Sequence, residues 1–296
     1  MIPDSLQQRL ETTDGQQTLT WQGRELVLFN QDWGQLAVAL TGAQVVHFQP
    51  TGDTAPWLWL TPTPAPPPAP LRGGIPLCWP WFGDERYADE HPDRPGPFHG
   101  TARLAPWRLD GVDEHEEGIE VHLSPEQRLH GRLNARAVIQ ANARRLHVEL
   151  ISENVGDAPV KTSAALHTYV AVSDAFACRL EGLAGARYLD KHRGFAEGEQ
   201  QGVLALGGAV DRIYHSNAAV DVDDGRRLLR VAKEQSDSTV VWHPGQTPLD
   251  DTPAAAARGF VCVEAANTRL DPVWLVPGAQ HLLGTTLTRP TTEDSA

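Results

Sequence analysis

The sequence has few cysteines, no long apolar run and no export signal. Cys78, Cys178 and Cys262 show no CxxC spacing, and their odd number argues against a disulfide framework or a zinc ribbon. No uninterrupted apolar run approaches the roughly 18 residues of a membrane-spanning helix. The N-terminus, MIPDSLQQRLETTDG, lacks the basic and apolar regions of a signal peptide. We therefore expect a soluble cytoplasmic protein with reduced cysteines in its core.

Several catalytic signatures are also missing. The sequence contains no GxxxxGK[ST], no GxGxxG between a strand and a helix, no HExxH and no GxSxG. Its 12 histidines form no tight HxH or HxxxH group, so a metal site would need ligands from distant strands. These absences argue against nucleotide-binding, zinc-protease and esterase functions, and we expect no metal.

Positive charge is scarce as well. The formal net charge is −13, which disfavours nucleic acid and anionic membranes as partners because both bind basic surfaces. An anionic small molecule would need a local pocket of arginines. No coiled coil or other assembly device is evident, so we expect a monomer.

What the sequence does contain is a series of short β-type runs separated by turn signals. Examples are 18–29, 118–124, 143–154 and 239–245, most of them with alternating polar and apolar residues. Such spacing is typical of an all-β protein, a large antiparallel β-sandwich. With 41% hydrophobic and 21% charged residues the chain can bury a sizeable core, and no composition shift divides it, so we expect one domain over 1–296.

A few local features interrupt the strands. Residues 4–11 predict a short helix with Asp4 or Ser5 as its N-cap, and 254–257 predict one further turn. The segments NVGD at 154–157 and DDGR at 223–226 predict turns between strands, the second one favouring a two-residue hairpin. The proline-rich segment 62–70 predicts an exposed loop, because proline removes backbone donors.

Two ionisable residues stand inside apolar strands. His167 lies in AALHTYVAVSD, where a structural core histidine is the plainer interpretation. Glu264 lies in GFVCVEAAN, and a carboxylate there costs several kcal/mol unless it is paired or functional. A buried carboxylate and a histidine can act as an acid and base pair, since their environment can bring both pKa values toward neutrality. The sequence alone does not show whether His167 and Glu264 lie together in the folded protein.

Other candidates surround glycine-containing segments. Arg72 in RGGIPLCWPWFG and Arg103 in HGTARLAPW could bind phosphate oxygens, or each could form a surface ion pair with one of the 38 acidic residues. Trp79, Trp81 and Phe82 could stack on a sugar or belong to the core.

Taken together, the motifs resemble a known enzyme family. RGGIPLCWPWFG, HG-x-AR, LHTY, YLDK and VCVE occur in the order found in the hexose-6-phosphate mutarotase branch (glucose-6-phosphate 1-epimerase) of the aldose 1-epimerase family. The resemblance extends from about residue 20 to 290. It implies a galactose mutarotase-like supersandwich that interconverts sugar anomers without metal or cofactor.

The resemblance also implies roles for particular residues. His167 and Glu264 match the catalytic pair, Arg72 and Arg103 match arginines that hold the substrate and its phosphate, and Asp190 matches a substrate-binding aspartate. His99 falls at a further site position. Two alternatives stay open: a mutarotase for unphosphorylated aldoses and a non-catalytic carbohydrate-binding sandwich.

Overall fold

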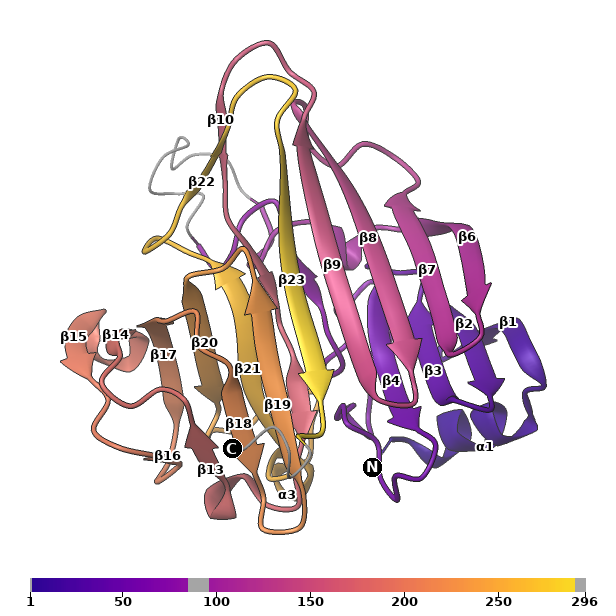
Figure 1. Ribbon diagram of the computed structural model, residues 1–296, viewed down its shortest axis with the longest axis horizontal. Coiled ribbons are helices and arrows are strands. Elements are labelled where there is room, and N and C mark those ends of the chain that lie inside the picture. Colours follow the sequence, from indigo (N-terminus) through magenta and orange to yellow (C-terminus); the bar gives the residue numbers. More distant parts are fainter. Residues whose placement is uncertain (1, 85–95, 291–296) are drawn as a thin grey trace.

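The computed structural model describes residues 2–84 and 96–290, and within these ranges the strands form four sheets in which every named strand pair is antiparallel. The nine-stranded sheet lies across the four-stranded and the eight-stranded sheets, so that the molecule is a sandwich with two sheets on one side (Figure 1). The all-β sandwich expected from the alternation of residues is confirmed.

The four-stranded sheet is built from consecutive strands near the N-terminus. Its order is β1-β2-β3-β4, with bounds β1 Gly15–Trp21, β2 Arg24–Gln31, β3 Gly34–Ala39 and β4 Gln44–Pro50. Helix α1, Asp4–Thr12, packs Leu6 and Leu10 on the outer face of this sheet, against Leu26 and Leu28.

The nine-stranded sheet forms the opposite layer. Its order is β16 Leu204–Ala205, β13 Arg179–Glu181, β18 Val220–Asp223, β19 Leu228–Glu234, β23 Gln280–Thr288, β9 Arg145–Asn154, β8 Leu133–Asn142, β7 Gly118–Pro125 and β6 Trp107–His115.

The eight-stranded sheet carries the candidate site. Its order is β15 Ala196–Glu199, β14 Arg187–Asp190, β17 Val210–His215, β20 Ser238–His243, β21 Phe260–Asn267, β11 Ala164–Leu166 and β5 Leu77–Cys78, and β12 Tyr169–Ala171 also pairs with β21. Strands β10 Val160–Thr162 and β22 Val273–Leu275 form a separate pair. The short helices are α3 Ala254–Ala257 and the 3₁₀ turns Ala102–Leu104, Ala175–Ala177 and Lys191–Arg193.

The main core lies between the layers. It joins Phe29 of β2, Val121 of β7 and Val148 of β9 with Val241 of β20 and Val263 of β21, so one apolar cluster spans all three large sheets. Burial on this scale is the dominant stabilising contribution to a sandwich. It also holds one face of β21 rigidly against the nine-stranded sheet.

Some local predictions need correction. Residues 18–29 are not one strand but the hairpin β1-β2, because Gln22 and Gly23 both adopt positive φ and turn the chain. Asp223 and Leu228 pair across four intervening residues, so DDGR closes a longer loop than predicted. NVGD connects β9 to β10, which pair with other strands.

The predicted helices are present, with a different cap. The first spans Asp4–Thr12, and its N-cap is Pro3 with no side-chain hydrogen bond, in place of Asp4 or Ser5. The turn at Ala254–Ala257 is confirmed. All three cysteines are free and buried, as expected. None of the described helices has the length and apolar character that crossing a membrane requires.

The proline-rich segment is a loop with a defined anchor. Nη2 of the buried Arg24 donates hydrogen bonds of 2.8 Å to the carbonyl oxygens of Ala65 and Ala69. A guanidinium that binds two carbonyls of one loop limits its motion at the edge of the four-stranded sheet. The segment runs directly into Leu71 and Arg72.

A glycine beside Arg72 is required by a close backbone approach. Gly74 has φ +60°, and a Cβ there would lie 2.0 Å from the carbonyl oxygen of Val45. At Gly185, with φ +77°, a Cβ would meet nothing within 4 Å. A side chain at either position pays the left-handed strain of about 1–2 kcal/mol, but only at Gly74 must the backbone also move.

We therefore expect Gly74→Ala to lower the free energy of unfolding by at least about 1 kcal/mol more than Gly185→Ala does. Urea unfolding, followed by circular dichroism, measures the free energy of unfolding of both variants. An unchanged slope of this free energy against urea concentration checks that unfolding stays two-state. Equal losses in the two variants would contradict the close approach of Gly74 to β4.

Candidate active site

Glu264 is positioned by the alternation of side chains along β21. Val263 and Ala265 face the main core, whereas Cys262 and Ala266 face the opposite side with Glu264. Residues two apart on a strand share a face. Glu264 therefore projects from the outer face of the eight-stranded sheet, away from the nine-stranded sheet.

His167 reaches Glu264 because two short strands flank it on the same neighbour. Leu166 of β11 pairs with Ala265 of β21, and Tyr169 of β12 pairs with Cys262. Counting inward from both pairs places His167 opposite Glu264, on the same face of the sheet. The Nε2 atom of His167 lies 3.4 Å from Oε1 of Glu264. The structure thus brings together the two residues that the sequence left far apart.

Apolar clusters enclose the pair on both sides. Trp59, Tyr169 and Phe260 form one cluster on this face, and Phe82 and Val240 belong to the other. Glu264 is only 1% exposed and His167 8%. Oε2 of Glu264 and Nδ1 of His167 are buried without a hydrogen-bond partner. Buried polar atoms without partners are rare, and here they leave hydrogen-bonding capacity for a ligand.

Burial governs the protonation of both groups. It raises the pKa of Glu264 well above its ordinary value, an effect that the charge of Lys191 opposes. Burial also lowers the pKa of His167 to about 3, and the positive charge of Arg103 acts in the same direction. Because both shifts disfavour the charged forms, the resting pair holds a neutral imidazole beside a carboxyl group of high proton affinity.

His99 adds a second neutral imidazole. It has φ +65°, and its Nδ1 accepts a 3.0 Å hydrogen bond from the backbone N–H of Gly83. Its ring is perpendicular to that of His167, with 5.6 Å between centroids. Burial lowers the pKa of His99 far below its ordinary value, with a further contribution from His167. The structure thus brings a third predicted site residue to the pair formed by His167 and Glu264.

Arg72 lies at one end of the site and is firmly held. Its Nε atom lies 2.6 Å from Oδ1 of Asp251, so the alternative of an ion pair is realised, and its guanidinium lies 6.0 Å from the centroid of the Trp242 ring. Trp242 in turn lies 6.1 Å from the ring of His167. The cation is therefore one aromatic ring away from the catalytic pair.

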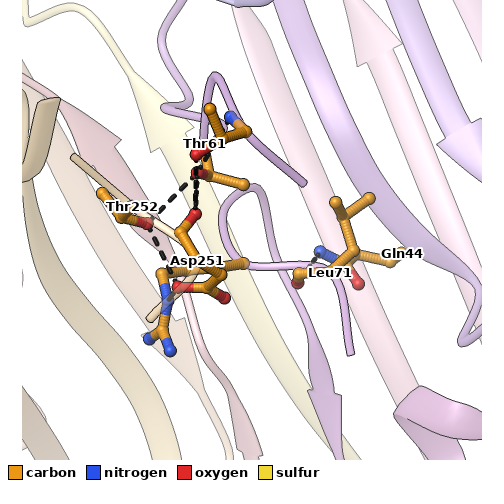
Figure 2. Close-up of polar contacts among 7 residues, drawn as sticks. Gln44, Thr61, Leu71, Asp251 and Thr252 are labelled. Carbon is orange, nitrogen blue, oxygen red and sulfur yellow. Dashed lines mark hydrogen bonds and ion pairs between the residues drawn. The ribbon is translucent and has the colours of Figure 1, made fainter. Parts of the chain in front are cut away.

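The segments around Arg72 are tied together by polar contacts. Gln44 donates hydrogen bonds to the carbonyl oxygens of Leu71 and Gly73, one on each side of Arg72. Thr61 donates to the carbonyl oxygen of Asp251, and Thr252 donates to the hydroxyl of Thr61 and to Oδ1 of Asp251. Figure 2 shows Thr61, Asp251 and Thr252 meeting in this network, with Gln44 beside Leu71.

Arg103 lies near the other end and has a different environment. It stands in the 3₁₀ turn Ala102–Leu104, and its Nη2 donates a 2.7 Å hydrogen bond to the carbonyl oxygen of Phe98. Its Nε atom is buried without a partner. In the part of the chain that the structure describes, no carboxylate forms an ion pair with Arg103. None of the described carboxylates thus compensates its charge.

Asp190 lies on the other face of the sheet. It pairs with Arg212, and Arg212 pairs with Val241 of the main core, whereas Ile213 and Val240 share the face of Glu264. One carboxylate oxygen accepts a hydrogen bond from the backbone N–H of His192, and the other lies 3.6 Å from Nε of Arg212. Asp190 therefore caps the 3₁₀ turn Lys191–Arg193 and forms an ion pair with Arg212. Substrate binding by Asp190 stays a prediction.

Sequence reasoning missed two neighbours of Asp190 that do face the site. Asp211 pairs with Trp242 and so lies on the face of Cys262 and Glu264. Nζ of Lys191 lies 3.2 Å from Oδ1 of Asp211 and 5.4 Å from the centroid of Phe82. The YLDK motif contained Lys191, but only the pairing of strands reveals which of its residues contacts the face of the sheet that carries Glu264.

The aromatic candidates divide between site and core. Trp79 is fully buried in the main core and donates a hydrogen bond to Oγ of Ser152. Phe82 belongs to the apolar cluster beside Glu264, where its ring lies 4.9 Å from that of His99. Nε1 of Trp81 donates to the carbonyl oxygen of Pro97. The plainer core interpretation therefore holds for Trp79, and Phe82 borders the pair formed by His167 and Glu264.

The catalytic pair also forms a potential metal-ligand set with Cys262. One ligand atom from each of His167, Cys262 and Glu264 lies within 4.8 Å of the others. Burial raises the pKa of the Cys262 thiol well above its ordinary value, with a contribution from Glu264. Metals bind the thiolate, so this donor set is poorly suited to a resident ion.

Comparison with known proteins identifies relatives along most of the chain. The family model described as aldose 1-epimerase matches residues 25–288. A Salmonella typhimurium protein named "Putative glucose-6-phosphate 1-epimerase" is 29% identical over 252 residues, which cover 81% of this chain and 82% of that protein.

Solved structures show the same architecture. The crystal structure of a Salmonella typhimurium protein described as a "putative mutarotase" has a TM-score of 0.82 at 25% identity, covering 94% of this chain and 95% of its own. A galactose mutarotase-like protein from Clostridium acetobutylicum has a TM-score of 0.73 at 12% identity, covering 94% of this chain and 98% of its own. The expected galactose mutarotase-like sandwich is confirmed.

The environment of His167 predicts an unusual titration. A histidine in water has a pKa of about 6.5. With its pKa lowered to about 3, the His167 ring stays neutral as the pH falls from 8 to 4.5. In NMR titrations of the free protein, the ring signal that His167→Gln removes is expected not to shift over this range. A midpoint between pH 5.5 and 7.5 would contradict the described environment.

Proposed function

Because the chain belongs to the aldose 1-epimerase family, we propose that it interconverts the α and β anomers of a hexose 6-phosphate, with glucose 6-phosphate as the first candidate. Family membership supports the isomerase class. The phosphate ester is the finer part of the proposal. The name of the Salmonella typhimurium relative and the two arginines near the catalytic pair support it.

The observation that carries the proposal is the 3.4 Å approach of His167 to Glu264. Mutarotation requires one proton to leave the anomeric hydroxyl and one to reach the ring oxygen. Both oxygens are attached to the same carbon, C1, so the acid and the base must be close neighbours. A histidine and a glutamate at this separation meet that requirement.

In the proposed mechanism the ionised form of Glu264 accepts the proton of the anomeric hydroxyl, while the protonated form of His167 donates its proton to the ring oxygen. The bond between C1 and the ring oxygen breaks, its electron pair goes to that oxygen, and C1 becomes an aldehyde. Rotation about the bond between C1 and C2 exposes the other face of the aldehyde. Reclosure reverses both proton transfers and gives the other anomer. Since each step moves only protons, no cofactor is required.

The arginines favour a phosphorylated sugar over a neutral one. Arg103 is a partly buried cation that no carboxylate compensates among the described residues. A phosphate oxygen would satisfy its buried Nε and balance its charge. A mutarotase for unphosphorylated aldoses would leave this cation unused, and a non-catalytic sugar-binding sandwich would have no need of a buried acid and base pair. We further propose that the enzyme acts as a cytoplasmic monomer, without nucleic-acid or membrane partners.

The direct test is an anomerisation assay. Freshly dissolved α-glucose 6-phosphate is followed by polarimetry with and without the protein, and free glucose and galactose are run in parallel. We expect faster equilibration, with the phosphate ester giving the largest kcat/KM. Acceleration of free galactose alone would overturn the choice of substrate, and no acceleration of any sugar would overturn the activity.

Substitution of the acid or the base should remove most of the acceleration. General acid and base catalysis contributes about 10²–10⁴-fold, so His167→Ala and Glu264→Gln should each lower kcat by about that factor. Asp221→Asn is a matched control, because Asp221 forms a surface ion pair with Arg230 on the other sheet. Near wild-type rates for either active-site variant would remove the proposed mechanism.

Loss of an arginine should weaken binding of the phosphate ester. A hydrogen bond to a charged group contributes about 1.5–3 kcal/mol, so Arg72→Ala or Arg103→Ala should raise the apparent Kd for glucose 6-phosphate by that amount. Calorimetric titration of each variant with glucose 6-phosphate measures these dissociation constants. An unchanged affinity in both variants would mean that the phosphate binds elsewhere.

A further inference from the structure

His167 has an unusual set of charged neighbours for a residue that must donate a proton. After burial, the positive charges of Arg103, Arg72 and Lys191 all lower its pKa. The neighbouring rings do not help it to hold a proton. Burial raises the pKa of the Tyr169 hydroxyl and so keeps that hydroxyl neutral. Burial also lowers the pKa of His99, which keeps the His99 ring neutral. The nearest negative group is Glu264, whose ionised form burial disfavours.

The three cations differ in how the protein compensates them. Arg72 is paired with Asp251 at 2.6 Å, and Lys191 is paired with Asp211 at 3.2 Å. Arg103 has no carboxylate partner among the described residues, and its Nε is a buried donor without an acceptor. It is also the cation that most strongly disfavours a proton on His167.

The position of Arg103 fits these effects. Nη2 of Arg103 binds the carbonyl oxygen of Phe98, and His99 follows directly in the chain. The ring of His99 lies 5.6 Å from the ring of His167. Arg103 is therefore connected to the catalytic acid through one residue and one ring contact, and the catalytic acid itself is only 8% exposed. Charges act over such distances much more strongly in an apolar medium than in water.

We propose that the phosphate group of the substrate activates the catalytic acid: a dianion bound at Arg103 balances the charge that otherwise keeps His167 deprotonated. This inference rests on the proposed function and assigns the phosphate a second role. Arg103 then acts as a positioning residue for a proton, in addition to binding the ester. Without an anion the acid is almost entirely uncharged, and a bound anion raises the fraction of His167 that carries the proton needed by the ring oxygen.

This coupling follows from reciprocal linkage. If protonation of His167 and binding of an anion at Arg103 favour each other, each must strengthen the other to the same degree. A change of one pKa unit corresponds to a tenfold change in the protonated fraction. The enzyme would then discriminate between sugars partly through kcat. An unphosphorylated sugar that binds in the same place would react more slowly, because His167 rarely carries a proton when no anion is bound.

The test separates the sugar from the anion. Free glucose is the substrate, and phosphite dianion is added in trans, with potassium chloride at matched ionic strength as the control. We expect phosphite to raise the enzymatic rate of glucose anomerisation by about tenfold or more at saturation. Inhibition by phosphite, or an effect equal to that of the chloride control, would overturn the proposal.

Substitution of Arg103 gives opposite predictions for two roles. If Arg103 only held the ester, Arg103→Met would slow the anomerisation of glucose 6-phosphate and leave the anomerisation of free glucose at its original rate. If its charge also suppresses the acid, Arg103→Met should raise the rate on free glucose several-fold and abolish the response to phosphite. Arg103→Lys keeps the charge and should retain part of the response. Arg187→Met is the matched control, since Arg187 forms an exposed ion pair with Glu197.

Direct titration of His167 provides a readout that a purely structural role would not move. In wild type, saturating phosphite should move the NMR midpoint of His167 upward from about 3, and in Arg103→Met the midpoint should already be higher without phosphite. If Arg103→Met does not fold, the wild-type titration alone decides. A midpoint that phosphite leaves in place would refute the inference.

The outcomes also distinguish this inference from the proposed function. A wild-type protein that fails to accelerate glucose 6-phosphate anomerisation contradicts the function itself. A protein that accelerates it, without a phosphite effect on glucose or on His167, contradicts only the activation of the acid.

Discussion

The site depends on one juxtaposition, that of an imidazole and a carboxylate in antiparallel register on adjacent strands. The backbone N–H of His167 donates a hydrogen bond to the carbonyl oxygen of Pro76, and the pairs on either side of His167 keep it opposite Glu264. Two proton-transfer groups are thereby held by backbone hydrogen bonds, and their separation does not rely on flexible loops. Pre-organisation of this kind is what acid and base catalysis at a single carbon atom requires.

Burial of this pair has an energetic consequence that shapes its surroundings. The apolar clusters that enclose Glu264 and His167 disfavour charge on both side chains. Three cations lie near this pair, and two of them form ion pairs with carboxylates. The result is a site with an excess of positive charge in a chain whose formal net charge is −13. A local reversal of the overall charge is typical of pockets that recognise anions, since focused fields inside an apolar cleft exceed those at an open surface.

Parts of this site could be predicted from residues alone, for physical reasons that differ from case to case. Glu264 stood out because a carboxylate within Val and Cys residues is costly, and the structure places it at 1% exposure. Asp190 was chosen from its motif, but alternation along β14 and β17 directs it to the face of Arg212, whereas Asp211 lies on the face of Glu264. Alternation gives the relative faces of residues on one strand, but it does not say which face of a sheet will be covered.

The sequence by itself determined the all-β class, the absence of a disulfide framework and the candidate acid and base, because alternation, cysteine spacing and the cost of a buried charge are local properties. The tertiary structure alone decided that His167 meets Glu264, that Asp251 holds Arg72, and that the buried Nε of Arg103 has no partner among the described residues. These relations join residues that lie far apart along the chain. They follow from which strands pair and in what register, and that depends on the packing of the whole sandwich.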